Sequence, residues 1–219
     1  MELIVVMTQA ARLESRRILI TGEDAELAAR LGTVFKRAGA VVRTTDGLPD
    51  EELHVAASPD AAVQKLGGLD VLVNIGPAVL PGDHPDLEQR SPDVERALVR
   101  FMERLVTTTE TALEAMSPGA SIINVVALSV DPLTAAHEAL AAAVVDTTQD
   151  WAAILMRRGI RVNVVVGGPS IDPAVEAELD GTDGEEPAAQ SAQLDVLVYL
   201  ASTNSSHVSW ISSVSGARL

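Results

Sequence analysis

The side chains of this chain that could move a proton near neutral pH are four histidines, His54, His84, His137 and His207. They are scattered along the sequence, and no two of them have the spacing of a metal-ligand pair. Cysteine is absent, which excludes a thiolate nucleophile, a thiolate metal site and a disulfide framework. We therefore predict no metal site, and the histidines by themselves define no catalytic site.

The segment Leu19–Ala28, LITGEDAELA, follows an apolar run and begins a helical pattern, which is where a nucleotide-binding turn would lie. Such a turn needs glycines, because its backbone must approach a pyrophosphate at a helix N-terminus. Gly22 is present, but Glu26 and Ala28 stand where two further glycines are expected. A side chain there fills the phosphate space, and a carboxylate also repels phosphate. Since acids suit a helix N-terminus, we interpret the turn as a helix start and expect no ordinary NAD(P) binding.

The overall charge excludes several classes of partner. The 219 residues include 31 acidic and 16 basic side chains, which gives a formal net charge of -15. Nucleic acids and anionic membranes require a basic surface, so we expect neither as a partner. No apolar run reaches the roughly 18 residues that a membrane helix needs, and the apolar start MELIVVM is too short for a secretion signal. These features predict a soluble, cytoplasmic protein.

Six short apolar runs, most of them rich in β-branched residues, are typical of strands buried on both faces. They are Arg17–Thr21, Ala40–Thr45, Asp70–Ile75, Ser121–Leu128, Arg161–Val166 and the weaker Ser209–Val214. Four longer amphipathic patterns predict helices at Asp24–Ala38, Pro92–Met116, Thr134–Arg157 and Ala188–Ala201. This alternation predicts an α/β fold with a doubly wound parallel sheet, like that of Rossmann domains.

The length of the chain suits one domain with a sizeable core. We assign residues 17–219 to this domain and residues 1–16 to an N-terminal arm or an added strand. The stretch between Thr45 and Asp70 has room for one short strand near LHVAA and one short helix.

Five segments, taken in order, resemble the short-chain dehydrogenase/reductase (SDR) family over nearly the whole chain. ITG before a helix resembles the family's TGxxxGxG turn, LDVLVNIGPA resembles LDVLVNNAG, and SIINVV resembles the SIVNISS strand. GIRVNVVVGGPSI is similar to GIRVNAVAPGxI, and the sequence from LVYLAS onward resembles the family's ending. The resemblance implies a single SDR-type Rossmann domain. A shared fold does not by itself imply a shared activity.

The resemblance also locates the positions that carry SDR chemistry. The family uses a tyrosine as acid and base, a lysine four residues later, a serine that polarises the carbonyl and an asparagine in a proton relay. In the order Tyr, Lys, Ser and Asn, these roles fall on His137, Ala141, Ala127 (or Val126) and Phe101. The only tyrosine of the chain is Tyr199 and the only lysines are Lys36 and Lys65, so no Tyr-x-x-x-Lys exists.

Among these positions only His137 carries a side chain that can transfer a proton. It lacks the neighbouring cation and carbonyl donor of the family site, so a histidine with a structural role is the alternative interpretation. Asn74, Asn163 and Gly168 match the family, but they help to build turns and strand ends. The turn at Gly22 and the four catalytic positions together indicate a degenerate member of the family.

Three functions agree with these observations. The first is a non-catalytic subunit that pairs with an active SDR paralogue, as in the mixed hydroxyacyl-CoA dehydrogenase and ketoacyl reductase complexes of this superfamily. The second is a standalone binding or sensor protein that holds a small ligand in the old cleft. The third is an oxidoreductase with a rebuilt site that uses His137.

The predicted helices Pro92–Met116 and Thr134–Arg157 correspond to the pair through which SDR proteins form dimers. A heteromer with the paralogue, or a homodimer, would use the same pair. The apolar side chains that we assign to this interface are Phe101, Leu105, Leu140, Val144, Trp151 and Leu155. Each helix must also pack one apolar face against the sheet, so the alternative is that these side chains belong to the core.

Overall fold

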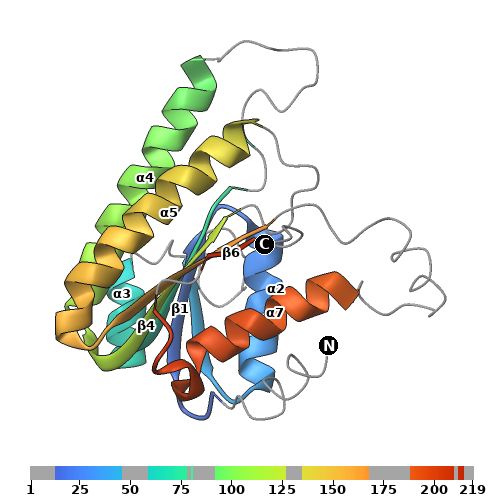
Figure 1. Ribbon diagram of the computed structural model, residues 1–219. Helices are drawn as coiled ribbons and strands as arrows, with labels where there is room; N and C mark the ends of the chain where they lie inside the picture. The colour runs from blue at the N-terminus through green and yellow to red at the C-terminus, as the bar shows by residue number, and fades with distance from the viewer. Residues whose placement is uncertain are drawn as a thin grey trace.

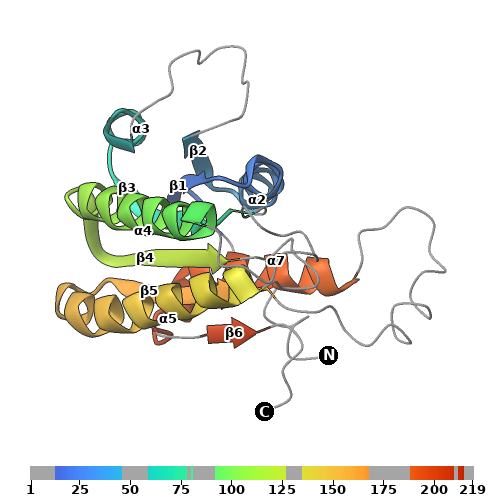
Figure 2. The same ribbon diagram turned by 90° about the horizontal axis from the view of Figure 1, so that it is seen from above.

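The computed structural model describes residues 13–45, 59–77, 80, 92–126, 135–167, 188–209 and 212–214. They form one six-stranded parallel sheet covered by helices on both faces (Figures 1 and 2). The strands lie in the order β2-β1-β3-β4-β5-β6. This is the doubly wound α/β fold that the sequence predicted, and the alternation of buried strands and helices accounts for it.

The strands begin at one edge of the sheet, which we call the amino edge, and end at the opposite carboxyl edge. Their bounds are β1 Arg17–Gly22, β2 Val41–Thr45, β3 Leu69–Ile75, β4 Met116–Val126, β5 Arg161–Val166 and β6 Ser212–Val214. All six residues of β5 are buried, as expected of a strand covered on both faces.

The helices form two layers. Their bounds are α2 Ala25–Arg37, α3 Pro59–Leu66, α4 Pro92–Leu113, α5 Ala135–Leu155 and α7 Ala188–Ala201, with short 3-10 turns η1 Met156–Arg158 and η2 Thr203–Ser205. Helices α2 and α7 pack on one face of the sheet, and α3, α4 and α5 cover the other. None of the helices in the described part of the chain is long and apolar enough to cross a lipid bilayer.

The structure corrects one predicted boundary. The helix predicted to end at Met116 ends at Leu113, and β4 begins at Met116, five residues before the predicted start at Ser121. Met116 is buried and pairs with Leu69 of β3, so its apolar side chain serves the sheet and not the helix. The nearby Pro118 could not have continued a helix.

Residues 13–16 of the predicted N-terminal arm pack against the domain. Leu13 is fully buried and its N–H donates to the carbonyl oxygen of Ala38 at 2.9 Å, while the N–H of Ser15 donates to that of Gly39 at 3.1 Å. Residues 1–12 and the strand predicted near LHVAA lie outside the described residues, whereas α3 supplies the short helix predicted beside that strand.

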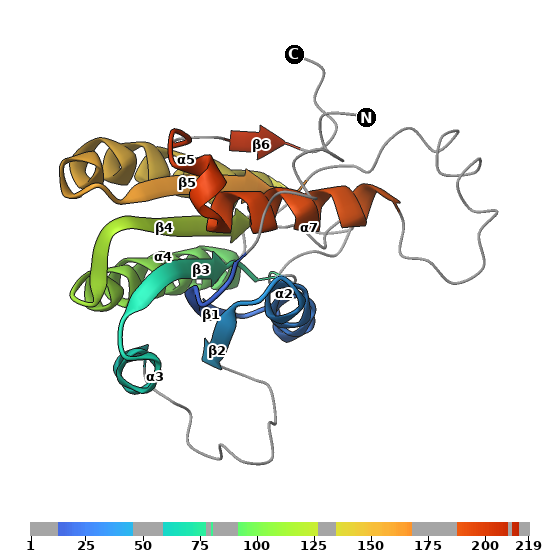
Figure 3. The same cartoon turned by 90° about the horizontal axis from the view of Figure 1, so that it is seen from below.

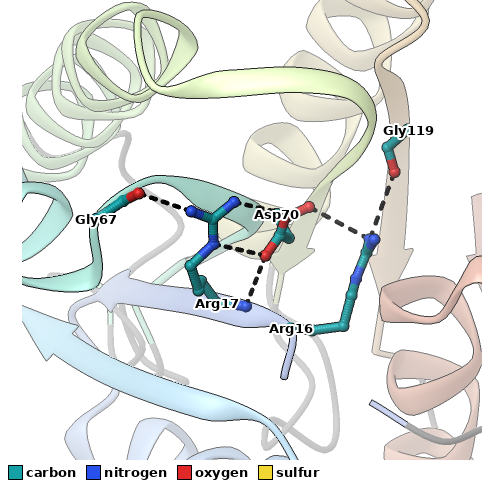
Figure 4. A network of polar contacts seen from close by, with 5 residues as sticks. All are labelled: Arg16, Arg17, Gly67, Asp70 and Gly119. Carbon is teal, nitrogen blue, oxygen red and sulfur yellow. Dashed lines mark hydrogen bonds and ion pairs between the residues drawn. The ribbon is translucent and has the colours of Figure 1, made fainter. Parts of the chain in front are cut away.

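An arginine–aspartate network closes the amino edge of the sheet (Figure 4). Asp70 of β3 accepts hydrogen bonds from the Nε, Nη2 and backbone N–H of Arg17, at 2.9, 3.1 and 2.9 Å. Arg17 also donates to the carbonyl oxygen of Gly67 at 2.7 Å, and Arg16 reaches the carbonyl oxygens of Asp70 and Gly119, each at 3.4 Å. Bidentate pairs of this kind fix geometry as well as charge, so the network holds β1, β3 and β4 in register.

Stability should therefore fall in acid because of Asp70. The hydrogen bond from the Arg17 side chain lowers the pKa of Asp70 below its usual value of 3.8. A lowered folded-state pKa stabilises the fold above the unfolded-state pKa, and this contribution is lost as the pH falls through the folded-state pKa. We expect the free energy of unfolding of wild type to exceed that of Asp70→Asn by about 1 kcal/mol near neutral pH. The difference is modest because the ion pair between Arg17 and Asp70 is partly exposed to solvent. Urea unfolding at about pH 6 and about pH 3 should show this difference shrinking in acid; an equal difference at both pH values would contradict the assignment.

Candidate functional site

Gly22 ends β1 and lies against β3, at the carboxyl edge where the sequence places a cofactor turn. A Cβ on Gly22 would meet the carbonyl oxygen and Cβ of Ile75 and would come within 2.8 Å of its Cα. Real Cβ atoms essentially never approach other atoms this closely, so the strand pair requires a glycine here. Packing therefore explains Gly22 without any cofactor.

The start of helix α2 carries a carboxylate at the place where a pyrophosphate would approach. Asp24 is the N-cap, it is buried, and its Oδ1 accepts a hydrogen bond from the N–H of Leu27 at 2.9 Å. Glu26 is exposed in the first turn, and Ala28 is buried in the core. With one helix N–H occupied by Asp24 and a second acid beside it, these residues do not fit the pyrophosphate of NAD(P).

Glu23, just before the cap, is exposed and forms an ion pair at 3.9 Å with Arg104 of α4. The hollow beside this pair has a volume of about 10 Å³. Its lining comes from the turn, from β3 and from α4, namely Thr21, Gly22, Asn74, Ile75, Phe101, Arg104, Leu105 and Thr108. Such a space is about the minimum for one water molecule, so among the described residues this hollow has no room for a nucleotide.

Phe101, at the position of the family's asparagine, belongs to an apolar cluster between α4, α5 and the sheet. Phe101 is 3% exposed and packs with Leu105 of α4 and with Leu140 and Val144 of α5. Val126 and Val166, which end β4 and β5 at the carboxyl edge, belong to the same cluster. In open α/β sheets ligands bind outside the carboxyl ends of the strands, and among the described residues the ends of β4 and β5 contribute apolar side chains to this cluster.

The other predicted catalytic positions lie on or next to this cluster. Ala141, at the lysine position, is part of it, and His137, one turn earlier on α5, is 1% exposed. Ala127, at the serine position, lies outside the described residues, and the adjacent Val126 is fully buried. The structure thus brings Phe101 and Ala141 into one apolar cluster and encloses His137 beside it, which leaves no open proton-transfer site among them.

A buried polar chain ties the sheet to α4 and α5. The Nδ2 of Asn74 donates to Asn124 Oδ1 at 2.9 Å and to Thr109 Oγ1 at 3.3 Å, and Asn124 Nδ2 donates to Thr148 Oγ1 at 2.9 Å. Sequence reasoning assigned Asn74 to structure but missed Asn124 and Thr148. Two asparagines inside the apolar runs DVLVNI and SIINVV were the available signal, since Asn74 and Asn124 stand at paired positions of β3 and β4.

The structure corrects the predicted interface. Five of the six proposed side chains, Phe101, Leu105, Leu140, Val144 and Leu155, are buried within the single chain, as the alternative interpretation held. Trp151 is half-buried and packs against two clusters of the same core. The helical stripe that was assigned to a partner therefore faces the sheet, because apolar periodicity marks a buried face without saying what covers it.

A different set of side chains lies on the outer face of α4 and α5. Val99 of α4, Ile154 of α5 and Met156 of the following turn η1 are large apolar residues that are 50%, 64% and 66% exposed. Ala139 and Ala142 are exposed one turn apart on α5. These residues are apolar positions that α4 and α5 could offer to another chain.

Comparison with known proteins decides the family. The sequence pattern of the family described as Enoyl-(Acyl carrier protein) reductase matches residues 7–209. The chain belongs to the short-chain dehydrogenase/reductase superfamily. The resemblance drawn from the five sequence segments is thereby confirmed, and the chain is a member of a superfamily of oxidoreductases.

Relatives within the SDR superfamily are distant but align over most of their length. The 2-(S)-hydroxypropyl-CoM dehydrogenase 3 of Xanthobacter autotrophicus is 28% identical over 199 residues, which cover 87% of this chain and 75% of that protein. Dehydrogenase/reductase SDR family member 6 of Rattus norvegicus is 27% identical over 231 residues, with coverage of 90% and 94%. A short-chain dehydrogenase from Burkholderia cenocepacia, crystallised in complex with NADP, has a TM-score of 0.67 at 18% identity, with coverage of 93% and 97%.

Proposed function

We propose that this chain is a non-catalytic SDR subunit that supports an active SDR paralogue in a hetero-oligomeric oxidoreductase. The observation that carries the proposal is the apolar cluster around Phe101, which includes the predicted asparagine and lysine positions and the ends of β4 and β5. The SDR neighbour crystallised with NADP shows which cofactor this fold can hold, whereas the acids at the start of α2 here disfavour it. A chain that keeps the fold without the reacting groups can still act by stabilising a partner.

The other two functions have less support. An oxidoreductase rebuilt around His137 would need that imidazole to meet substrate, and it is buried in α5. A small-ligand sensor would need a cleft, and the hollow at the old turn holds about one water molecule.

The outer face of α4 and α5 is the surface that we assign to the partner. The two helices lie side by side along one face of the molecule (Figures 1 and 2). Exposed alanines on α5 permit close approach of another helix, and Val99 and Ile154 offer apolar area. Glu103 of α4 and Asp146 of α5 are exposed on the same helices, and with a net charge of -15 they favour a less acidic partner over a second copy.

The test is a substitution that changes this face without entering the core. Ala142→Arg places a long cation on an exposed position of α5, so the free chain should keep its stability. The partner is to be captured on the tagged chain from the native host and identified by mass spectrometry. We expect Ala142→Arg to reduce the recovered partner at least tenfold, and the partner's oxidoreductase activity to fall with it.

The matched control is Thr33→Arg, which puts the same side chain on an exposed position of α2 in the opposite layer. This variant should recover the partner like wild type. Recovery of no second SDR chain, or equal recovery with Ala142→Arg, would overturn the proposal. So would binding of NADPH to the isolated chain at micromolar concentration in calorimetry, because a working cofactor site would indicate an enzyme.

A further inference from the structure

The basic side chains of this acidic protein concentrate at the amino edge of the sheet, opposite to the site described above. In a parallel sheet each helix returns to the amino edge before the next strand begins, so helix ends and strand starts gather there. Figure 3 shows the molecule from below, with β4, β5 and β6 running across the view. Half of the 16 lysines and arginines lie on it: Arg16, Arg17, Lys36, Arg37, Lys65, Arg157, Arg158 and Arg161.

Contacts across the edge show that these cations belong to one surface. The backbone N–H of Val41 donates to the carbonyl oxygen of Arg16 at 2.8 Å, which joins the start of β2, just after α2, to the start of β1. Arg17 reaches Gly67 beyond α3, and Arg16 reaches Gly119, whose N–H donates to the carbonyl oxygen of Gly159 beyond η1. Five segments that are distant in the sequence thus meet at the edge.

The charge of this surface is opposite to that of the chain. Among the described residues, the eight cations face four carboxylates at the edge, Glu14, Asp70, Glu110 and Glu114, and Asp70 is held by Arg17. Arg161 is buried, and burial lowers its pKa to about 10, so it stays charged at neutral pH. Five of the cations are exposed to solvent, namely Lys36, Arg37, Lys65, Arg157 and Arg158.

Helix dipoles favour cations and disfavour acids at each helix C-terminus, but they do not explain the arginines Arg17 and Arg161 at the starts of β1 and β5. We propose that the amino edge is a docking surface for an acidic polypeptide of a partner protein. The net charge of -15 repels a nucleic acid along its length, whereas an acidic segment or a limited acidic patch can meet the edge alone. This inference does not depend on the proposed heteromer, since it concerns the opposite side of the sheet.

The test uses a fluorescent ten-residue polyglutamate peptide as the probe and measures anisotropy with the full chain. We expect binding at about 20 mM salt that weakens steeply by about 200 mM, as the Debye length shortens. Arg37→Glu combined with Arg157→Glu should weaken binding at least tenfold. Both positions are exposed, and circular dichroism should show an unchanged fold.

The matched control is Arg43→Glu combined with Arg100→Glu, which makes the same change of net charge at exposed positions of β2 and α4, away from the edge. This control should bind the peptide within about twofold of wild type. Equal weakening by the two double variants would show a net-charge effect and overturn the docking surface. Tighter binding of a duplex DNA of matched charge, lost in the Arg37 and Arg157 variant, would overturn the class of partner.

Discussion

Replacing Gly22 by valine is expected to lower the free energy of unfolding by about 3 kcal/mol. The new Cβ would stand within 2.8 Å of the Ile75 Cα, and the nearest atoms belong to the backbone of a central strand. A flexible side chain could move away, but β3 is held between β1 and β4 by ladders on both sides. Relief would require separating β1 from β3 at the carboxyl edge.

Gly32→Ala is the control for this substitution. Gly32 lies inside α2, and an added Cβ there meets nothing within 4 Å. We expect it to raise stability by about 0.5–1 kcal/mol, because alanine loses less backbone entropy than glycine in a helix. Urea unfolding followed by circular dichroism measures both variants, and a Gly22→Val protein as stable as wild type would refute the packing argument.

The same argument changes what the glycine says about function. Gly22 is the single glycine of the expected cofactor turn that this chain retains, and its retention could suggest a surviving site. Since the contact with β3 requires it, Gly22 would be kept in a protein that never meets a dinucleotide. At Glu26 and Ala28 no such packing contact requires a glycine. At these two positions the glycines that would admit a phosphate are absent.

The fold could be predicted from the sequence because it depends on patterns that are repeated along the chain. The buried run Arg161–Val166 and the helix Ala188–Ala201 are found at their predicted bounds, and each of the six apolar runs contains a strand in the part of the chain that the structure describes. The N-cap role of the acids after Gly22 also follows from residue type alone, and Asp24 fills it.

What the apolar faces of α4 and α5 pack against could not be predicted in the same way. Leu105 and Val144 have the periodicity of a buried face, and nothing in that periodicity tells a sheet from a partner chain. Nor could residue counting show that Phe101 completes an apolar cluster, since this depends on α4 and α5 converging on the ends of β4 and β5. The pairing of Asn124 with Thr148 likewise needs the register of two elements that are distant in sequence.

Restoring the family's residue at Phe101 should damage the protein instead of repairing it. Phe101→Asn removes a buried ring from the cluster with Leu105, Leu140 and Val144 and places an amide among apolar side chains. Loss of a buried aromatic side chain and burial of an amide without a partner each destabilise a fold. We expect the free energy of unfolding to fall by about 3–4 kcal/mol, measured by urea unfolding.

Val99→Asn is the matched control, because it introduces the same amide two residues away on a half-exposed position of α4 and should change stability by less than about 1 kcal/mol. Phe101→Leu, which keeps the site apolar, should lie between the two at about 1–1.5 kcal/mol. If Phe101→Asn were as stable as wild type, the space around residue 101 would accept a polar group. The main support for a non-catalytic role would then be lost. If it is strongly destabilised while Val99→Asn is not, then the chain draws stability from the place where an SDR enzyme keeps its proton relay, and it could regain that relay only by giving up part of its core.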